Sequence, residues 1–388
     1  MSTLTQAIRH RSGTYRTLTA AQTWERVRPQ LPAFAITRVA DITLLDEIGL
    51  PVHVAYRPTG KTLAVSVGTG LTHDQARVSA VMESIEGWHA ENPRLEIIAR
   101  SPAGDLDVGY DVRSLNLPPR SPLTGATVVD WVAGRGVLTG REYPIPFDPI
   151  FLDFTDLRPW GDVLFRPTSS GLASGNTLAE ATLHALHELV ERDCMTPYAL
   201  SGLAQRVYVD PASSRNPDTL AVLAAIRSVD CWVEVCDLTN DVGIPCYGAS
   251  IWSEDIPMIF GGFGCHIDPD IAVGRALAEA AQSRLTTISG ARDDIDGNVY
   301  RYVNPLAPRP ATIAHAAGAI RRHEAPSDSI DAALRFAAER VHAKTGVEPI
   351  VVDLTRAGIG IPVSKVFAPG LLLMDDHALS ARPKGNDG

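Results

Sequence analysis

A short pattern of alanines and acidic residues occurs three times in this 388-residue chain. The pattern A-x3-A-x2-E-x2-[EQ] begins at Ala76, Ala181 and Ala272, and each copy follows a glycine-containing segment (68–70, 171–175 and 261–264). Side chains three and four residues apart share one face of a helix. Each copy therefore predicts a strand that turns into a helix with an acidic stripe, and the recurrence predicts a fold built around three such units.

The middle copy, within Gly171 to Asp193, has the clearest helical pattern. At about 100° per residue, its polar side chains fall on one side of the helix and its leucines and Val190 on the other. A solvated surface helix would explain one such face, but not one spacing kept three times. The polar side carries Asn176, Glu180, His184, Glu188, Glu191 and Arg192.

The alanines at i and i+4 let each helix lie close to a neighbour, which would bring the three acidic stripes toward one space. Carboxylates in one space repel one another unless cations are present, so the pattern predicts a site for hard metal ions. Because Mg²⁺ commonly shares its protein ligands with phosphate oxygens, a nucleotide is the expected companion. The predicted metal ligands are Glu83, Glu86, Glu180, Glu188 and Glu191.

Three segments then carry a resemblance to a known family. SVGTGLTHDQARVSAVMESIEGWHAE, GLASGNTLAEATLHALHELVERD and GFGCHIDPDIAVGRALAEAAQSRLTTISGARDD together resemble the YcaO family, which uses ATP and Mg²⁺ to activate peptide backbone amides. The likeness covers nearly the whole chain. It is strongest to the branch that works beside a small partner called TfuA and is associated with thioamide formation.

The resemblance implies roles for individual residues. It makes Glu83, Glu188 and Arg192 catalytic, and it makes Glu83 and Glu86 metal ligands. Many family members read G-K-G where this chain has Gly68-Thr69-Gly70, so a lysine near the site is missing or is supplied elsewhere. The residues expected to bind ATP are Arg16, Thr23, Ser79, Asn176, His184, Arg275, Glu279, Gln282 and Arg284.

The expected fold class is α+β, a YcaO-type fold with mixed and antiparallel sheets and three strand-turn-acidic-helix units around a central ATP and Mg²⁺ site. Residues 1–54 are predicted to be an N-terminal segment that contributes to the nucleotide site and to recognition of the substrate or partner. Residues 55–378 are predicted to be the catalytic domain, and 379–388 a polar, disordered tail.

Composition narrows the function classes. The net charge of -10 argues against nucleic-acid binding, and no apolar run approaches the roughly 20 residues that cross a bilayer. The N-terminus lacks the apolar centre of a signal peptide, so we expect a cytoplasmic protein with no membrane partner. Five cysteines form no paired C-x2-C, which argues against a cysteine zinc site and favours reduced, buried thiols.

The reaction that the resemblance implies is transfer of the γ-phosphoryl group of ATP to an amide oxygen of a ribosomally made precursor peptide, which makes that oxygen a good leaving group. No residue in the chain has the pattern of an obligatory covalent nucleophile. The incoming group is then sulfide from a sulfur donor, which gives a thioamide, or the peptide's own Cys, Ser or Thr, which gives an azoline. Azoline-forming members often end in a proline-spaced tail, whereas this chain ends in ARPKGNDG, which favours the thioamide.

Two hypotheses of other classes stay open. The chain is a catalytically silent subunit that recognises a peptide, or its carboxylates hold metals for hydrolysis without ATP. The sequence also leaves open a homodimer and the need for a TfuA-like partner protein.

Overall fold

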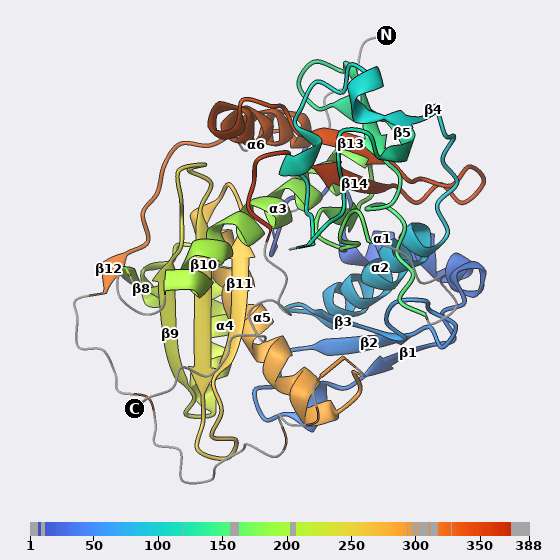
Figure 1. Ribbon diagram of the computed structural model, residues 1–388. Helices are drawn as coiled ribbons and strands as arrows, with labels where there is room; N and C mark the ends of the chain where they lie inside the picture. The colour runs from blue at the N-terminus through green and yellow to red at the C-terminus, as the bar shows by residue number, and fades with distance from the viewer. Residues whose placement is uncertain are drawn as a thin grey trace, which may run out of the picture.

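Three β-sheets make up the fold, and each is packed against one of the three acidic helices (Figure 1). The computed structural model describes residues 7–8, 12–118, 120–155, 163–201, 207–292, 294–295, 297, 300, 310, 317–326 and 328–373. Within these residues, every paired strand runs antiparallel to its neighbour except the pair β8 and β12, which is parallel.

The first sheet lies at the right of Figure 1, in blue, with α2 (His73–Glu91) packed on it. Its strands follow the order β1 (Arg38–Asp41), β2 (Val52–Tyr56) and β3 (Val65–Thr69). The helix α1 (Ala20–Val27) packs beside α2. Both helices begin with a capping box, in α1 at Thr19 with Gln22 and in α2 at Thr72 with Gln75, which confirms the predicted start of α2.

The second sheet lies at the left of the view, in yellow, and is packed against α5 (Pro269–Ser289). Its order is β11 (Phe260–Cys265), β10 (Cys246–Trp252), β9 (Trp232–Asp237), β8 (Val207–Asp210) and β12 (Gly318–Ala319). The helix α4 (Pro217–Ser228) packs against α5. The helix α5 starts at the cap Asp268 with a proline at its first position, and Gly290 in the left-handed conformation follows its last residue.

The third sheet lies at the top of the view and is packed against α3 (Leu178–Ser201). Its order is β4 (Ala99–Pro102), β5 (Val128–Gly136), β13 (Ile350–Asp353), β14 (Val363–Phe367) and β7 (Leu172–Ser174), and β6 (Glu142–Pro146) pairs with β5. The helix α6 (Ile330–Thr345) shares a buried apolar cluster with α3 through Leu186, Ala337 and Val341.

The predicted fold class is confirmed: the fold is α+β, and β3–α2, β7–α3 and β11–α5 are three strand-turn-acidic-helix units. The segment boundary proposed at residue 54 falls inside β2, which spans residues 52–56. This strand pairs with both β1 and β3, so one sheet includes residues from both sides of the boundary. The proposed tail, 379–388, lies outside the described residues. Among the helices that the structure describes, none is both long and apolar enough to cross a bilayer.

Candidate active site

Each of the three units holds one glutamate in the same way. Glu83, Glu188 and Glu279 occupy the first acidic position of the repeat, and each accepts a hydrogen bond from a backbone N–H located 16 or 17 residues earlier. A backbone donor fixes a carboxylate more rigidly than a mobile side chain does. These bonds run from Val67 to Glu83 (3.2 Å), from Gly171 to Glu188 (3.1 Å) and from Phe263 to Glu279 (3.1 Å).

The alanines of the repeat are explained by close contact between helix and strand. A Cβ added to Gly68 in β3 would lie 2.1 Å from the nitrogen of Ala80 and 2.4 Å from the carbonyl oxygen of Ala76. A Cβ added to Gly262 in β11 would likewise lie 2.2 Å from the nitrogen of Ala280 and 2.4 Å from the carbonyl oxygen of Ala276, both in α5. The neighbour that the alanines allow to approach is therefore the preceding strand of the same unit, and not another acidic helix.

Side chains connect the three units to one another. Glu86 on α2 accepts hydrogen bonds from the N–H (2.7 Å) and hydroxyl (2.6 Å) of Ser174 in β7. The amide of Gln282 on α5 donates to the Val67 carbonyl in β3 (3.4 Å). Through these contacts the strand of one unit meets the acidic face of another, and the carboxylates of α2, α3 and α5 come together although they lie far apart in the sequence.

The ionisation of these carboxylates reports the same crowding. Burial is the main reason that the pKa of Glu83 is raised to about 7 and that of Glu86 to about 8, and the negative charge of Glu188 contributes to both rises. Burial and then the neighbouring Glu191 raise the pKa of Glu279 to about 7. Burial also raises the pKa of Glu188, against the opposing charge of Arg192. A cluster that is partly protonated near neutral pH is one that a divalent cation would deprotonate on binding, so the donor set fits Mg²⁺.

A basic group lies beside the carboxylates. A guanidinium nitrogen of Arg275 on α5 lies 3.4 Å from Nε2 of His184 on α3. Burial lowers the pKa of Arg16, the charge of Glu180 opposes this, and Arg275 lowers it further, which places all three near one another. Burial lowers the pKa of His184 well below its usual value, followed by Arg275 and Arg16, so this imidazole is neutral beside the two arginines. A guanidinium nitrogen of Arg192 lies 3.9 Å from a carboxylate oxygen of Glu188, so a further positive charge borders the carboxylates.

The N-terminal segment joins the site through Glu180 and Asn176. One oxygen of Glu180 accepts from the N–H and hydroxyl of Thr17, both at 2.5 Å, and the other accepts from the backbone and side chain of Asn176 at 2.9 and 3.1 Å. The hydroxyl of Thr23 donates to Asn176 (2.8 Å). Glu180 would have to release protein donors to bind a metal, so its predicted ligand role stays a prediction, whereas Thr23, Asn176 and Arg16 are brought together as a group.

Two predicted nucleotide contacts differ from the rest. Ser79 is exposed on α2, one turn before Glu83. Arg284 is buried in an ion-paired cluster, with its Nε 3.1 Å from both oxygens of Asp46 and another nitrogen 2.6 Å from Asp255. These bonds tie α5 to its surroundings, and we do not carry Arg284 into the proposed nucleotide site.

Comparison with known proteins then identifies the family. The sequence profile of YcaO cyclodehydratases, described as binding ATP and Mg²⁺, matches residues 67–372. An uncharacterized protein of Mycobacterium tuberculosis is 36% identical over 373 residues, which cover 94% of this chain and 84% of that protein. The chain belongs to the YcaO family. The predictions of this family and of ATP and Mg²⁺ as its cofactors are confirmed.

Further relatives agree with this assignment. A Rhizobium leguminosarum bv. trifolii protein named for its place in the tfuA 3′ region is 34% identical over 384 residues, covering 92% of this chain and 88% of that protein. YcaO from Methanopyrus kandleri, solved with AMPPCP and Mg²⁺, has a TM-score of 0.72 at 24% identity and covers 94% of both chains. A heterocyclase in complex with substrate and cofactor has a TM-score of 0.71 at 22% identity, covering 96% of this chain and 54% of that one. These two structures share the fold.

Lys365 in β14 is a basic residue near the carboxylates that the sequence did not reveal. Lys365 is buried, and its ammonium group donates to the carbonyls of Thr168 and Ser170, the latter at 2.9 Å. It also opposes the rise in the pKa of Glu188 that burial produces. A lysine inside an apolar strand is the signal that would have revealed it, since a buried charge needs a partner. Thr69, which stands at the expected lysine position, instead donates to the Pro51 carbonyl at 3.1 Å.

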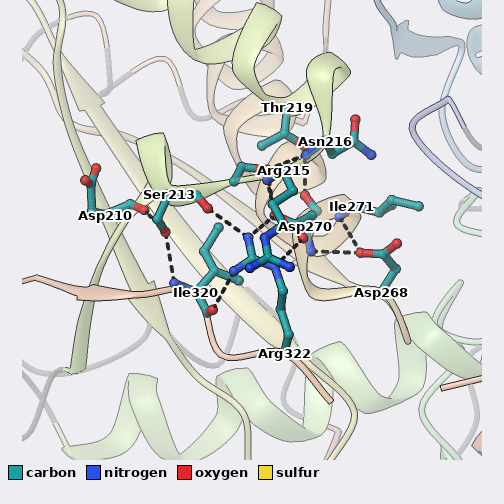
Figure 2. Close-up of polar contacts among 11 residues, drawn as sticks. Asp210, Ser213, Arg215, Asn216, Thr219, Asp268, Asp270, Ile271, Ile320 and Arg322 are labelled. Atoms are coloured by element: carbon teal, nitrogen blue, oxygen red, sulfur yellow. Dashed lines mark hydrogen bonds and ion pairs between the residues drawn. The ribbon is translucent and has the colours of Figure 1, made fainter. Parts of the chain in front are cut away.

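A polar network fixes the start of α5 and therefore the position of Arg275 and Glu279 (Figure 2). Asp270, in the first turn, accepts from the Ser214 hydroxyl (2.7 Å), the Arg215 N–H (2.9 Å) and two nitrogens of Arg322 (3.0 Å each). Arg322 also donates to the Ser213 carbonyl at 2.8 Å. Arg322, one member of the basic pair Arg321-Arg322, therefore helps to hold this helix in place.

Proposed function

We propose that this YcaO chain uses ATP and Mg²⁺ to phosphorylate a backbone amide oxygen of a precursor peptide, and that sulfide then replaces that oxygen to give a thioamide. The observation that carries the proposal is the meeting of buried carboxylates from α2, α3 and α5 beside two arginines. Carboxylates suit Mg²⁺ and arginines suit phosphate, so one space has the two complementary halves of a Mg²⁺–ATP site.

The proposed metal ligands are Glu83, Glu86, Glu188 and Glu191, with Glu180 as a further candidate. When bound, Mg²⁺ neutralises the phosphate oxygens and orients the γ-phosphoryl group. Arg16 and Arg275 bind the phosphates as fixed charges, because their guanidinium groups are held among buried neighbours. Arg192, whose guanidinium lies 3.9 Å from the Glu188 carboxylate, would stabilise the charge that develops during transfer.

The remaining contacts belong to the nucleotide. Thr23 and Asn176 already share a hydrogen bond and present polar groups beside the first turn of α3, where a helix N-terminus favours anions. Ser79 is exposed on α2 and free to donate its hydroxyl to a ligand. His184 stays neutral: its Nε2 accepts from Arg275, and its buried Nδ1–H is left to donate to a ligand.

The reaction balances without a protein nucleophile. The amide oxygen forms a bond to the γ-phosphorus as the bond to ADP breaks, and sulfide then attacks the amide carbon as phosphate leaves. All five cysteines are buried and none forms a disulfide, and burial raises the pKa of Cys265 and Cys231, so neither is a ready thiolate. The absence of a ready thiolate among these cysteines favours an external sulfur donor. The relative named for the tfuA 3′ region supports the same proposal.

Mass spectrometry of the peptide product tests the proposal. The purified chain receives its precursor peptide, ATP, Mg²⁺ and sulfide, with a TfuA-like protein in a parallel reaction. Exchange of one oxygen for sulfur adds about 16 Da and proceeds even where no Cys, Ser or Thr follows the modified residue, because the phosphoryl chemistry does not use the side chain.

Three other outcomes would contradict it. Loss of about 18 Da without sulfide would make the chain an azoline-forming cyclodehydratase, while leaving the phosphoryl chemistry unchanged. Peptide binding without ATP turnover would make it a recognition subunit. Hydrolysis with Mg²⁺ alone would remove ATP from the reaction.

A further inference from the structure

A second group of metal-binding side chains lies where the first sheet meets the start of α2. Asp41 ends β1, His53 is in β2, and His73 is the first residue of α2. One ligand atom from each lies within 4.8 Å of the other two. His73 precedes Glu83 by ten residues on the same helix, which places the two about 15 Å apart along its axis. The group is therefore separate from the carboxylates described above.

The spacing of the three atoms suits one small cation. Nε2 of His53 lies 3.2 Å from Nδ1 of His73, and these two nitrogens lie 3.9 and 3.2 Å from Oδ2 of Asp41. A triangle with these sides contains a point about 2.0 Å from all three corners, which is the distance at which Zn²⁺ binds imidazole nitrogen and carboxylate oxygen. A hydrogen bond brings only two atoms together, whereas here all three ligand atoms lie within 3.9 Å of one another.

The surroundings hold the aspartate in the required orientation. Oδ1 of Asp41 accepts from the N–H of Thr43 (3.0 Å) and from its hydroxyl (2.5 Å), which leaves Oδ2 facing the two imidazoles. Partners of this kind orient metal ligands in proteins. The side chain of His53 is 11% exposed, whereas those of Asp41 and His73 are 48% and 60% exposed, so the group opens to solvent on one side. Water can complete the coordination shell there.

We propose that Asp41, His53 and His73 bind one divalent transition-metal ion, with Zn²⁺ as the best match to two imidazoles and one carboxylate. Mg²⁺ is a poor match, because it prefers oxygen ligands in octahedral geometry. The ion fastens β1 and β2 to the first turn of α2. Since His53 lies opposite Gly68 in the sheet, and Gly68 packs directly on α2, the ion stabilises the contact that positions Glu83.

Cobalt binding to the full chain tests the proposal, because Co²⁺ in a four-coordinate site of the kind that Zn²⁺ prefers absorbs visible light more strongly than Co²⁺ in a six-coordinate site of the kind that Mg²⁺ prefers. The metal-free protein is titrated with Co²⁺ in excess Mg²⁺, which occupies the carboxylates. His73→Ala and Asp41→Asn change exposed side chains and leave the core intact. His342→Ala, on the exposed face of α6, is the matched control.

We expect one equivalent of Co²⁺ with the strong absorption in the wild type and in His342→Ala, and at least about tenfold weaker binding in the other two variants. Zn²⁺ should also raise the melting temperature of the wild type more than that of His73→Ala, by binding to the folded state. Equal binding in the wild type and in His73→Ala, or no strong absorption in either, would mean that the three side chains form a hydrogen-bonded cluster without a metal.

Discussion

Glu188 is the residue whose replacement most directly separates catalysis from folding. Glu188→Gln keeps the size of the side chain and an oxygen that can accept from Gly171, but it removes one negative charge from the cluster. ATP turnover should fall by about 10²- to 10³-fold, because a displaced cation no longer neutralises the transferring phosphoryl group. The melting temperature without Mg²⁺ should stay the same or rise, since like charges repel less. Glu339→Gln, at an exposed position of α6, is the control. Full activity in Glu188→Gln would contradict a role of Glu188 in metal binding.

The same carboxylates predict how pH changes the response to Mg²⁺. The pKa values of Glu83, Glu86 and Glu279 are raised to between about 7 and about 8 by burial, so the folded state holds their protons at pH values where the unfolded state has lost them. Their contribution to the stability of the metal-free protein therefore decreases as the pH rises above their ordinary pKa of 4.5, and it is fully lost above about pH 8. Mg²⁺ binds the deprotonated form and should raise the melting temperature more at about pH 8.5 than at about pH 6. An equal rise at both would contradict the assignment.

At the scale of elements, Gly262 in β11 permits the close approach of this strand to α5. Gly262→Ala would place a methyl group 2.2 Å from a backbone nitrogen of α5, so the helix must move, and we expect a loss of about 1–3 kcal/mol in the free energy of unfolding. Gly261→Ala is a matched control one residue away, where the nearest atom would be 3.9 Å distant. Urea denaturation measures both variants. Equal stability of the two would mean that the close approach is not required.

The contact of Arg322 with Asp270 at the start of α5 predicts that Arg322 and its neighbour Arg321 differ in their contribution to stability. Arg322→Ala removes the partner of a partly buried Asp270 carboxylate and should cost about 1–2 kcal/mol. Arg321→Ala removes an exposed arginine and should change the free energy of unfolding by less than about 0.5 kcal/mol. Denaturant unfolding of the two variants under identical conditions tests this, and similar losses would assign no anchoring role to Arg322.

For the whole molecule, the repeated pattern was sufficient to predict three strand-turn-helix units, because helix periodicity and caps such as Thr72 and Asp268 are local signals. The pattern also pointed to Glu83, Glu86, Glu188 and Glu191, whereas Arg16 and Arg275 were expected only from the family resemblance. It could not predict Lys365, whose role depends on the pairing of β14 with β7, or the ion pairs that commit Arg284 elsewhere. The reason is physical: which strand edges and loops meet is decided by packing between distant segments, and one sequence carries no direct record of that pairing.

The proposed function requires carboxylates from three helices to form one Mg²⁺–nucleotide site. Calorimetric titration with AMPPCP, with and without Mg²⁺, tests it in Glu83→Gln, Glu188→Gln, Glu279→Gln and the double variant Glu83→Gln/Glu188→Gln. We predict that binding of the wild type requires Mg²⁺, that each single variant binds at least about tenfold more weakly, and that the double variant loses little more than either parent, because residues that share one site are not additive. Losses that add as for independent sites, or full affinity after changing one of the three helices, would contradict the account.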